Sequence, residues 1–405
     1  MIPVEEALAR VLAGVGGPTG AEAVPLRRAA GRTLAADLAA LRTQPPFDTS
    51  SMDGYAVRSA DVAALPASLR VVGRSAAGHG FHGAVGPGEA ARIFTGAPLP
   101  EGADGVVPQE DAEADGDRVT VRAARRPDRF VRRRGLDFEA GQVLLAQGTR
   151  LDARSLALAA AMGHATLPVH RRPRVALLAT GDELAWPGEA AGADRIMASN
   201  PFALAALAEA AGAEVASLEL ARDTVESLEA AVRAASGSGV DLLVTLGGAS
   251  VGDHDLVRPV LARLGMSLDF WQVALRPGKP LLHGRLGPTA LIGLPGNPVS
   301  AIVCGLLFVV PALRRLSGEG SAGRDPSEPA RLGADLPAND ARQDYPRAVL
   351  EEGADGLPRA MPLPVQDSSM LVALARSGAL IVRPPHAPAA RAGDLCRVIR
   401  FDRLL

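Results

Sequence analysis

Apolar residues in the central part of the chain alternate between short continuous runs and stretches with helical spacing. The runs at 175–179, 214–220 and 240–246 predict buried strands, and the stretches between and after them, at 201–211, 223–235 and 256–264, predict helices. Two more strands are expected near 268–275 and 289–292, before a long apolar helix from Pro298. Because strands alternate with helices, this region is expected to form a parallel sheet covered by helices.

The N-terminal third has a different pattern, with short β-like runs between glycine and proline. Such runs at 69–73, 90–94 and 118–121 predict a small β-rich module. Helices are expected at 1–12 and 150–162. They suggest one discontinuous domain that surrounds the β-rich module.

The C-terminal region is separated from the centre by a stretch rich in glycine, serine and proline. This stretch, at 317–329, is expected to be a linker. Beyond it, the runs at 347–350, 379–382 and 395–400 predict short strands with frequent turns. A small β-barrel or sandwich is therefore expected at the C-terminus.

The composition of the 405 residues excludes several classes of protein. Hydrophobic residues make up 47% and aromatic residues 3%, which fits two to four domains with small aliphatic cores. The net charge of −2 offers no general attraction for nucleic acid, and seven arginines between Arg122 and Arg134 are interpreted as a solvated face. The longest apolar run, 301–310, is too short to span a bilayer, so no membrane partner is expected.

The N-terminal residues and the cysteines bear on the cellular location of the protein and on its possible metal ligands. Glu5 and Glu6 stand where an export signal has positive charge, so a cytoplasmic protein is expected. The only cysteines, Cys304 and Cys396, are far apart in the sequence and provide neither a disulfide framework nor a cysteine zinc site. Any metal is expected to have oxygen ligands.

Lysine is almost absent from the chain. Of the 43 basic residues only Lys279 is a lysine. A drift toward arginine removes lysines whose role arginine can fill, so this residue predicts a site that needs a compact ammonium group. Chance survival is the alternative, and the position within the Gly/Pro-bounded segment RPGKP argues against it.

Polar loops directly follow three of the predicted strands, at 180–183, 247–255 and 294–300. In an open parallel sheet the carboxyl ends of the strands lie at one edge, and ligands bind there where the strand order reverses. The three loops are therefore expected to line one pocket.

The second loop, GGASVGDHD, is rich in glycine. Positive φ angles and close backbone approach to an anion are expected at its glycines, which include Gly247, Gly248 and Gly252. Ser250 is a further candidate binding residue in this loop. Asp253 and Asp255 offer oxygen ligands to a hard cation. A tight turn in which Asp255 caps the next helix is the alternative.

The third loop, PGNPVS, predicts a helix start. Asn297 is expected to cap a helix with Pro298 in its first turn, which directs free N–H groups and the positive end of the helix dipole into the crevice. Together with Pro295 and Gly296, this favours a phosphate or another oxyanion. Plain capping is the alternative for Asn297.

Two carboxylates complete the predicted pocket. Glu183 lies in the first loop, where a solvated loop acid is the alternative. Asp223 stands before a helix with Glu226 three positions on, so a capping box is the alternative. Carboxylates, a lysine and helix ends at one site are what phosphoryl transfer or hydrolysis with Mg²⁺ requires.

Motifs along nearly the whole chain resemble the molybdopterin molybdenumtransferase family, whose fold is shared by the C-terminal part of gephyrin. In chain order they are PPFDTSSMDGYAVR, RIFTGAPLPEGADGVV, VRRRGLDFEAGQVL, TGDEL, LGGASVGDHD, RPGKP, GLPGNPVSA, RQDYPRAVL and QDSSML. The first two come from the unusual segments 45–61 and 92–111, which taken alone would pass as loops. Coincidence does not explain so many motifs in one order.

The resemblance implies an α/β multi-domain fold. Its parts are a discontinuous linker domain with the N-terminal helix at 1–55 and 130–172, a β-rich domain at 56–129, a central doubly wound, mostly parallel α/β molybdopterin-binding domain at 173–318, and a C-terminal β-barrel at 319–405. It also implies a homodimer with the active site between subunits.

The reaction implied by the resemblance is the insertion of molybdate into adenylylated molybdopterin, with Mg²⁺-dependent cleavage of the phosphoanhydride and release of AMP. The residues at the family's active-site positions are Asp53, Thr95, Glu183, Asp223, Asp255, Lys279 and Arg276. Glu183, Asp223 and Asp255 are the implied metal ligands. The positions that hold molybdate in the family match Lys279, Ser300, Arg347 and Ser368.

The chain departs from the family pattern at Leu136, where the family often has an acid, and at Val372 and Ala373, where it often has serines. Candidate partners are molybdopterin adenylyltransferase and maturation proteins of molybdoenzymes. Two other functions stay open from the sequence: a scaffold that keeps the fold and binds proteins, and a different nucleotide pyrophosphatase.

Overall fold

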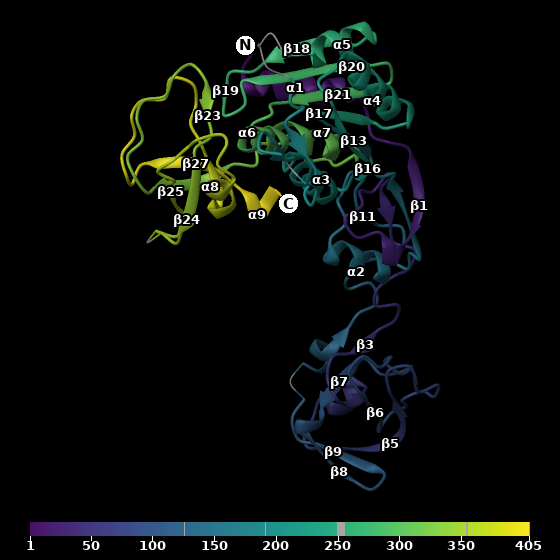
Figure 1. Cartoon of the computed structure of the whole chain (residues 1–405). Helices are drawn as coiled ribbons and strands as arrows, with labels where there is room; N and C mark the ends of the chain where they lie inside the picture. The colour runs from purple at the N-terminus through teal and green to yellow at the C-terminus, as the bar shows by residue number, and fades with distance from the viewer. Residues whose placement is uncertain (125, 191, 249–255, 354, 405) are drawn as a thin grey trace.

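The computed structural model of the chain describes residues 1–124, 126–190, 192–248, 256–353 and 355–404. Figure 1 shows an elongated, bent arrangement, with the β-rich module at one end and the large α/β domain at the bend. The C-terminal barrel lies beside the α/β domain, far from the β-rich module. The predicted α/β multi-domain fold is confirmed.

The central domain is built on a six-stranded sheet with the order β16-β13-β17-β21-β20-β18. Its strands are β13 (Arg174–Thr180), β16 (Glu214–Ala221), β17 (Leu242–Leu246), β18 (Ser267–Gln272), β20 (Pro280–Leu286) and β21 (Thr289–Leu294). Strands β13, β16, β17 and β21 pair in parallel, whereas β20 pairs antiparallel with both of its neighbours, β21 and β18. The mostly parallel sheet is confirmed. Strand β20 was not predicted, because its sequence PLLHGRL contains a proline and a glycine that are typical of turns.

Helices cover both faces of this sheet. They are α3 (Asn200–Ala210), α4 (Val225–Gly237), α5 (Val257–Arg263) and a long helix formed by α6 (Pro298–Cys304), the π-helical Gly305–Val309 and α7 (Val310–Leu316). Residues of β13 alternate between the two cores: Val175 and Leu177 pack with α3, α6 and α7, and Ala176 packs with α4 and α5. This alternation follows the two-residue period of a strand.

The long helix continues past the proline that ends the apolar run in the sequence. Pro311 lies in the first turn of α7, directly after the π-helical turn. Proline lacks an N–H donor and clashes with the preceding turn, so the wider π turn gives it room. Among the described residues this helix, Pro298–Leu316, is long and apolar enough to cross a membrane, yet 72% of it is buried inside the protein. A helix that is mostly buried in this way is typical of the core of a folded domain.

The linker region is built from two distant stretches of chain. Its elements are β1 (Ala21–Pro25), β2 (Leu38–Ala39), β3 (Thr49–Ser50), β10 (Val131–Arg132), β11 (Val143–Leu145), α2 (Ala153–Ala161) and β12 (Thr166–His170). Leu34, Met162 and Leu167 are fully buried in its core. The N-terminal helix α1 (Val4–Gly14) was grouped with this region, but Val4, Ala7 and Val11 pack in the α/β core instead. The larger apolar surface there covers its apolar stripe.

The β-rich module has one six-stranded sheet with the order β7-β4-β6-β5-β9-β8. The strands are β4 (Gly54–Val57), β5 (Ala67–Ser75), β6 (Glu89–Ile93), β7 (Gly105–Pro108), β8 (Ala112–Asp115) and β9 (Arg118–Val121). Strand β4 lies between β6 and β7, so the residues just before β4 and just after β6 come together.

The C-terminal domain is a closed barrel with the order β22-β25-β24-β26-β27. Its elements are β22 (Glu328–Leu332), β23 (Gln343–Asp344), β24 (Arg347–Glu351), β25 (Arg359–Pro362), α8 (Leu371–Arg376), β26 (Ala379–Val382), β27 (Leu395–Arg400) and α9 (Phe401–Leu404). The preceding stretch, predicted as a linker, is anchored: Glu319 forms ion pairs with Arg150 and Arg314 at 3.8 and 3.7 Å. The predicted exact domain limits stay a prediction.

Candidate active site

A pocket of about 710 Å³ opens at the carboxyl edge of the α/β sheet. It is lined by the ends of β13, β17 and β21, including Thr180, Leu246 and Pro295. The chain runs from β13 outward to β16 and then crosses back to β17 on the other side of β13, so the strand order reverses there. The three predicted loops therefore meet at the switch point of the sheet, as far as the structure describes them.

The first two glycines of the second loop have the conformation that the sequence predicts. Gly247 and Gly248 have φ angles of 96° and 62°. A Cβ at residue 247 would lie 2.8 Å from the carbonyl oxygen of Thr180, and one at residue 248 would lie 2.2 Å from a methyl carbon of Val257. Larger residues would push the loop away from β13. Ser250, Gly252 and Asp255 lie outside the described residues.

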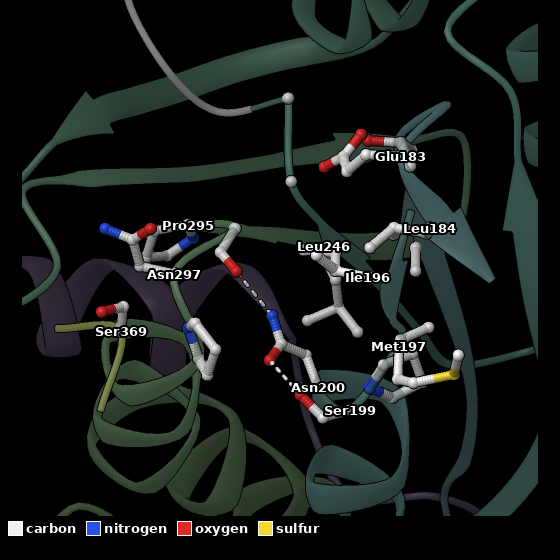
Figure 2. A pocket seen from close by; sticks show the side chains of 18 of the residues that line it. Glu183, Leu184, Ile196, Met197, Ser199, Asn200, Leu246, Pro295, Asn297 and Ser369 are labelled. Atoms are coloured by element: carbon white, nitrogen blue, oxygen red, sulfur yellow. Dashed lines mark hydrogen bonds between the residues drawn. The ribbon is translucent and has the colours of Figure 1, made fainter. Parts of the chain in front are cut away.

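Glu183 directly precedes β14 (Leu184–Ala185), which pairs in parallel with β15 (Ile196–Met197). Residues of both short strands line the pocket together with Glu183. The N–H of Ile196 donates to the carbonyl oxygen of Glu183 at 2.7 Å. A Cβ at residue 181 would lie 2.5 Å from Oε2 of Glu183, so Gly181 leaves room for the carboxylate in this position. In Figure 2, Glu183 lies across the pocket from Asn297 and Ser369, with Leu246 and Ile196 between them.

Asp223 also lines the pocket, and it is not the helix cap. Thr224 caps α4, because its hydroxyl accepts a hydrogen bond from the N–H of Ser227 at 3.2 Å. The capping role considered for Asp223 is therefore wrong. Its backbone N–H donates to the carboxylate of Asp182 at 3.3 Å. Two acidic side chains, Glu183 and Asp223, thus face one cavity.

Asn297 joins the α/β domain to the C-terminal domain. It stands at the N-cap position of α6, with Pro298 in the first turn, but its side chain makes no capping bond. The amide instead donates to Oγ of Ser368 at 2.9 Å, and the N–H of Val299 donates to the carbonyl oxygen of Ser368 at 3.0 Å. Gly296 accepts a bond from the side chain of Asn200 at 2.7 Å. The predicted Ser368 is therefore brought to the pocket loop from the last domain.

The other residues predicted to hold an oxyanion lie around this junction. Ser300 is buried on α6, one residue beyond Val299. Lys279 is exposed and precedes Pro280, which lines the pocket. Arg347 is only 2% exposed, and its Nη2 donates to the carbonyl oxygen of Asp367 at 3.2 Å. Burial lowers the pKa of Arg347, and its Nε has no hydrogen-bond partner in the described structure.

Arg276, predicted as a catalytic residue, is not among the residues that line the pocket. Its guanidinium contacts the C-terminal domain, with Nη2 2.5 Å from a carboxylate oxygen of Asp344 and Nη1 3.3 Å from one of Asp340. The hydrogen bond to Asp344 raises the pKa of Arg276.

Asp53 and Thr95 form a separate pair on the β-rich module. Asp53 precedes β4 and Thr95 follows β6, and neither residue lines the pocket. The N–H and the hydroxyl of Thr95 both donate to one carboxylate oxygen of Asp53 at 2.8 Å. These bonds, with the charge of Arg92, lower the pKa of Asp53. In Figure 1 strand β6, which Thr95 follows, lies at the opposite end of the molecule from the α/β sheet.

Comparisons with known proteins cover almost the whole chain. Family models described as MoeA N-terminal region (domain I and II), probable molybdopterin binding domain and MoeA C-terminal region (domain IV) match residues 2–163, 176–315 and 329–401. A molybdopterin molybdenumtransferase of Haemophilus influenzae is 34% identical over 100% of both chains. One of Nostoc is 37% identical over 90% of this chain and 85% of its own.

The chain belongs to the molybdopterin molybdenumtransferase family. A solved structure of the molybdopterin biosynthesis MoeA protein of Pyrococcus horikoshii is 31% identical and covers 99% of each chain with a TM-score of 0.83. The resemblance seen in the sequence is thereby confirmed, as is the identification as a member of an enzyme family. The alternative of a scaffold that keeps the fold and binds proteins is not supported by these enzyme relatives.

Several residues that line this transferase pocket were not predicted. They are Leu184, Ile196, Met197, Ser199, Asn200, Pro280 and Ser369. Two-residue strands such as β14 and β15 leave no periodic pattern, so the apolar wall they form had no signal in the sequence. Ser369 had one, because it stands next to Ser368 in QDSSML. Of the departures from the family pattern, Leu136 and Val372 are exposed, at 66% and 62%.

Proposed function

We propose that the protein inserts molybdate into adenylylated molybdopterin, with Mg²⁺-dependent cleavage of the phosphoanhydride and release of AMP. The observation that carries this proposal is the meeting of Glu183, Asp223 and the glycine turn at Gly247 in one pocket of a molybdopterin molybdenumtransferase. A pocket of about 710 Å³ is in the range of small-molecule sites.

The donor set fits a magnesium ion shared with a phosphate. Among the described residues, no three acidic, histidine or cysteine side chains are close enough to hold a metal alone. Mg²⁺ commonly takes one or two carboxylates and completes its shell with water and substrate phosphates. Glu183 and Asp223 provide two such carboxylates, and Asp255 is proposed as a third from the resemblance. When bound, Mg²⁺ neutralises charge on the pyrophosphate as it is cleaved.

Backbone groups of the pocket are proposed to hold the pyrophosphate. Gly247, Gly248, Pro295, Gly296 and Asn297 line the cavity. The N-terminal end of the long helix carries the positive end of the helix dipole, which attracts anions. Ser250 and Gly252 are proposed with them from the loop sequence. These groups orient the phosphates so that the anhydride faces the two acids.

Molybdate is proposed to bind where the α/β and C-terminal domains meet. The residues proposed to hold it are Lys279, Ser300, Arg347 and Ser368. Support comes from the buried guanidinium of Arg347, whose Nε lacks a partner among the described residues. A buried cationic donor without a partner is costly, and an oxyanion satisfies it.

Asp53 and Thr95 are proposed to reach the pocket of the partner subunit in a homodimer. Support comes from the position of the pair, because neither Asp53 nor Thr95 lines the pocket of its own chain. Exposed apolar residues on the linker region, Leu41, Phe47 and Leu136, favour association with another surface. The domain limits given above and a cytoplasmic location are part of the same proposal.

The test is an insertion assay with purified full-length protein, adenylylated molybdopterin, molybdate and Mg²⁺. We expect AMP release and formation of molybdenum cofactor in equal amounts, and loss of both when EDTA replaces Mg²⁺. Ordinary dinucleotides should stay uncleaved. Cleavage of dinucleotides without molybdenum insertion would contradict the proposal and favour a general pyrophosphatase.

A further inference from the structure

Arg276 is bound to the C-terminal barrel through both its side chain and its backbone. Its Nη2 bonds the Asp344 carboxylate at 2.5 Å and Oδ1 of Asn339 at 3.2 Å. The short strand β19 (Leu275–Arg276) pairs in parallel with β23, and the N–H of Tyr345 donates to the carbonyl oxygen of Arg276 at 2.9 Å. Arg276 thus contributes both a side-chain and a backbone contact to the junction between the α/β domain and β23.

The segment that Arg276 holds leads directly to Arg347. Asp344 is separated from Arg347 only by Tyr345 and Pro346, and Arg347 begins strand β24. The N–H of Arg347 donates to the side chain of Gln366 at 2.9 Å. Arg347 therefore stands only three residues after the carboxylate that Arg276 contacts.

A second contact point ties the same part of the barrel to the pocket. Arg347 donates to the carbonyl oxygen of Asp367, and the next residue, Ser368, is bonded by Asn297 and Val299. The barrel is thus fixed to the α/β domain at Arg276 on one side and at Ser368 on the other. Arg347 lies between these two contact points.

We propose that Arg276 is a positioning residue, which acts through Asp344 to hold Arg347 and Ser368 at the N-terminal end of α6 and makes no contact with substrate. This assigns Arg276 a different role from the catalytic one predicted from the family motif. It rests on the proposed function, in which Arg347 and Ser368 hold molybdate. The forked guanidinium suits the task, because it contacts Asp344, Asp340 and Asn339 at once.

The test is a double-mutant cycle with Arg276→Gln, Asp344→Asn and the variant carrying both, made in the full-length protein. We expect each single change to raise KM for molybdate about tenfold with little change in kcat, and the double change to raise it by about the same factor, because both remove one interaction. KM for the adenylylated pterin should stay constant. Arg276→Lys should recover part of the loss.

Arg331→Gln is the matched control. Arg331 pairs with Asp355 on the same barrel at 2.8 Å, with similar side-chain exposure of 40% against 43% for Arg276. It should leave KM for molybdate unchanged. Single effects that multiply to about a hundredfold in the double variant would mean that Arg276 and Asp344 act independently of each other, and this would overturn the proposal. No effect of either single change on KM would also overturn it.

Amide hydrogen exchange of peptides that span 343–350 separates this inference from the proposed function. Arg276→Gln should speed exchange there and leave the α/β core unchanged, because the bond from Tyr345 to Arg276 is loosened. If the wild-type protein inserted no molybdenum, the proposed function would fail. Faster exchange in Arg276→Gln would still support the positioning role of Arg276. Unchanged exchange would overturn the positioning role of Arg276, whatever the molybdenum-insertion activity of the variant.

Discussion

The pocket at the sheet edge and the Asp53–Thr95 pair are two groups of predicted site residues with opposite surroundings. The pocket is lined by three strand ends, by residues of the paired strands β14 and β15, and by Ser369 of the C-terminal domain, all within one chain. The pair is equally ordered, since two hydrogen bonds of 2.8 Å fix the carboxylate, yet it borders no part of that pocket. This difference is the reason for the proposal that the Asp53–Thr95 pair serves the pocket of another chain.

The largest expected effect is on kcat and comes from a change to an acid of the pocket. Glu183→Gln removes the negative charge and should lower kcat of molybdenum insertion by at least about a hundredfold, because charge stabilisation at the reacting phosphates is lost. The side chain is exposed, so the unfolding temperature should not change. AMP release in the assay above measures the effect.

Glu226→Gln is the control for that prediction. Glu226 is an exposed acid in the first turn of α4, three residues after Asp223, and does not line the pocket. Its replacement should leave turnover unchanged. Equal losses in both variants would mean that general charge, and not the pocket, supports the reaction.

A smaller effect tests the cation at the junction of the domains. Lys279→Arg keeps the charge but replaces a compact ammonium with a planar fork, so KM for molybdate should rise roughly tenfold. Titration of initial rates with molybdate measures it. Unchanged KM would show that the single lysine survived by chance.

The smallest effect concerns the remote pair. Thr95→Val removes the hydroxyl bond to Asp53 and keeps the N–H bond, so the pKa of Asp53, which Thr95 holds below its usual value, should rise. If ionised Asp53 is the active form, activity is then lost at a higher pH on the acid side of the profile. At neutral pH we expect a loss of about threefold. An unmoved acid limb of kcat/KM would exclude a catalytic role for the ionised carboxylate.

The sequence predicted the sheet and the meeting of its loops because both follow from local patterns. Buried strands such as β13 and β17 are continuous apolar runs, and the glycines at 247 and 248 stand where the chain needs positive φ. The N-cap position of Asn297 was also predicted, although its side chain bonds Ser368 instead of capping. A cap pattern fixes where a helix begins, but it does not fix which distant group competes for the side chain.

Contacts between domains could not be predicted in this way. Arg276 matches a motif position, and only the folded barrel shows that Asp344 takes its guanidinium. The packing of α1 against the α/β core and the anchoring of Glu319 likewise depend on surfaces from distant parts of the chain. Such contacts leave no periodicity in one sequence, because they are set by how finished domains meet.

The most direct test of the composite site is complementation between two variants that we expect to be inactive when each is made alone. Asp53→Asn and Glu183→Gln chains, co-expressed with different tags and purified by both tags, give mixed dimers in which one site carries both changes and the other carries none. If Asp53 serves the partner's pocket, these mixed dimers should recover about half of the wild-type activity. Mixed dimers as inactive as the two parent variants would contradict the account.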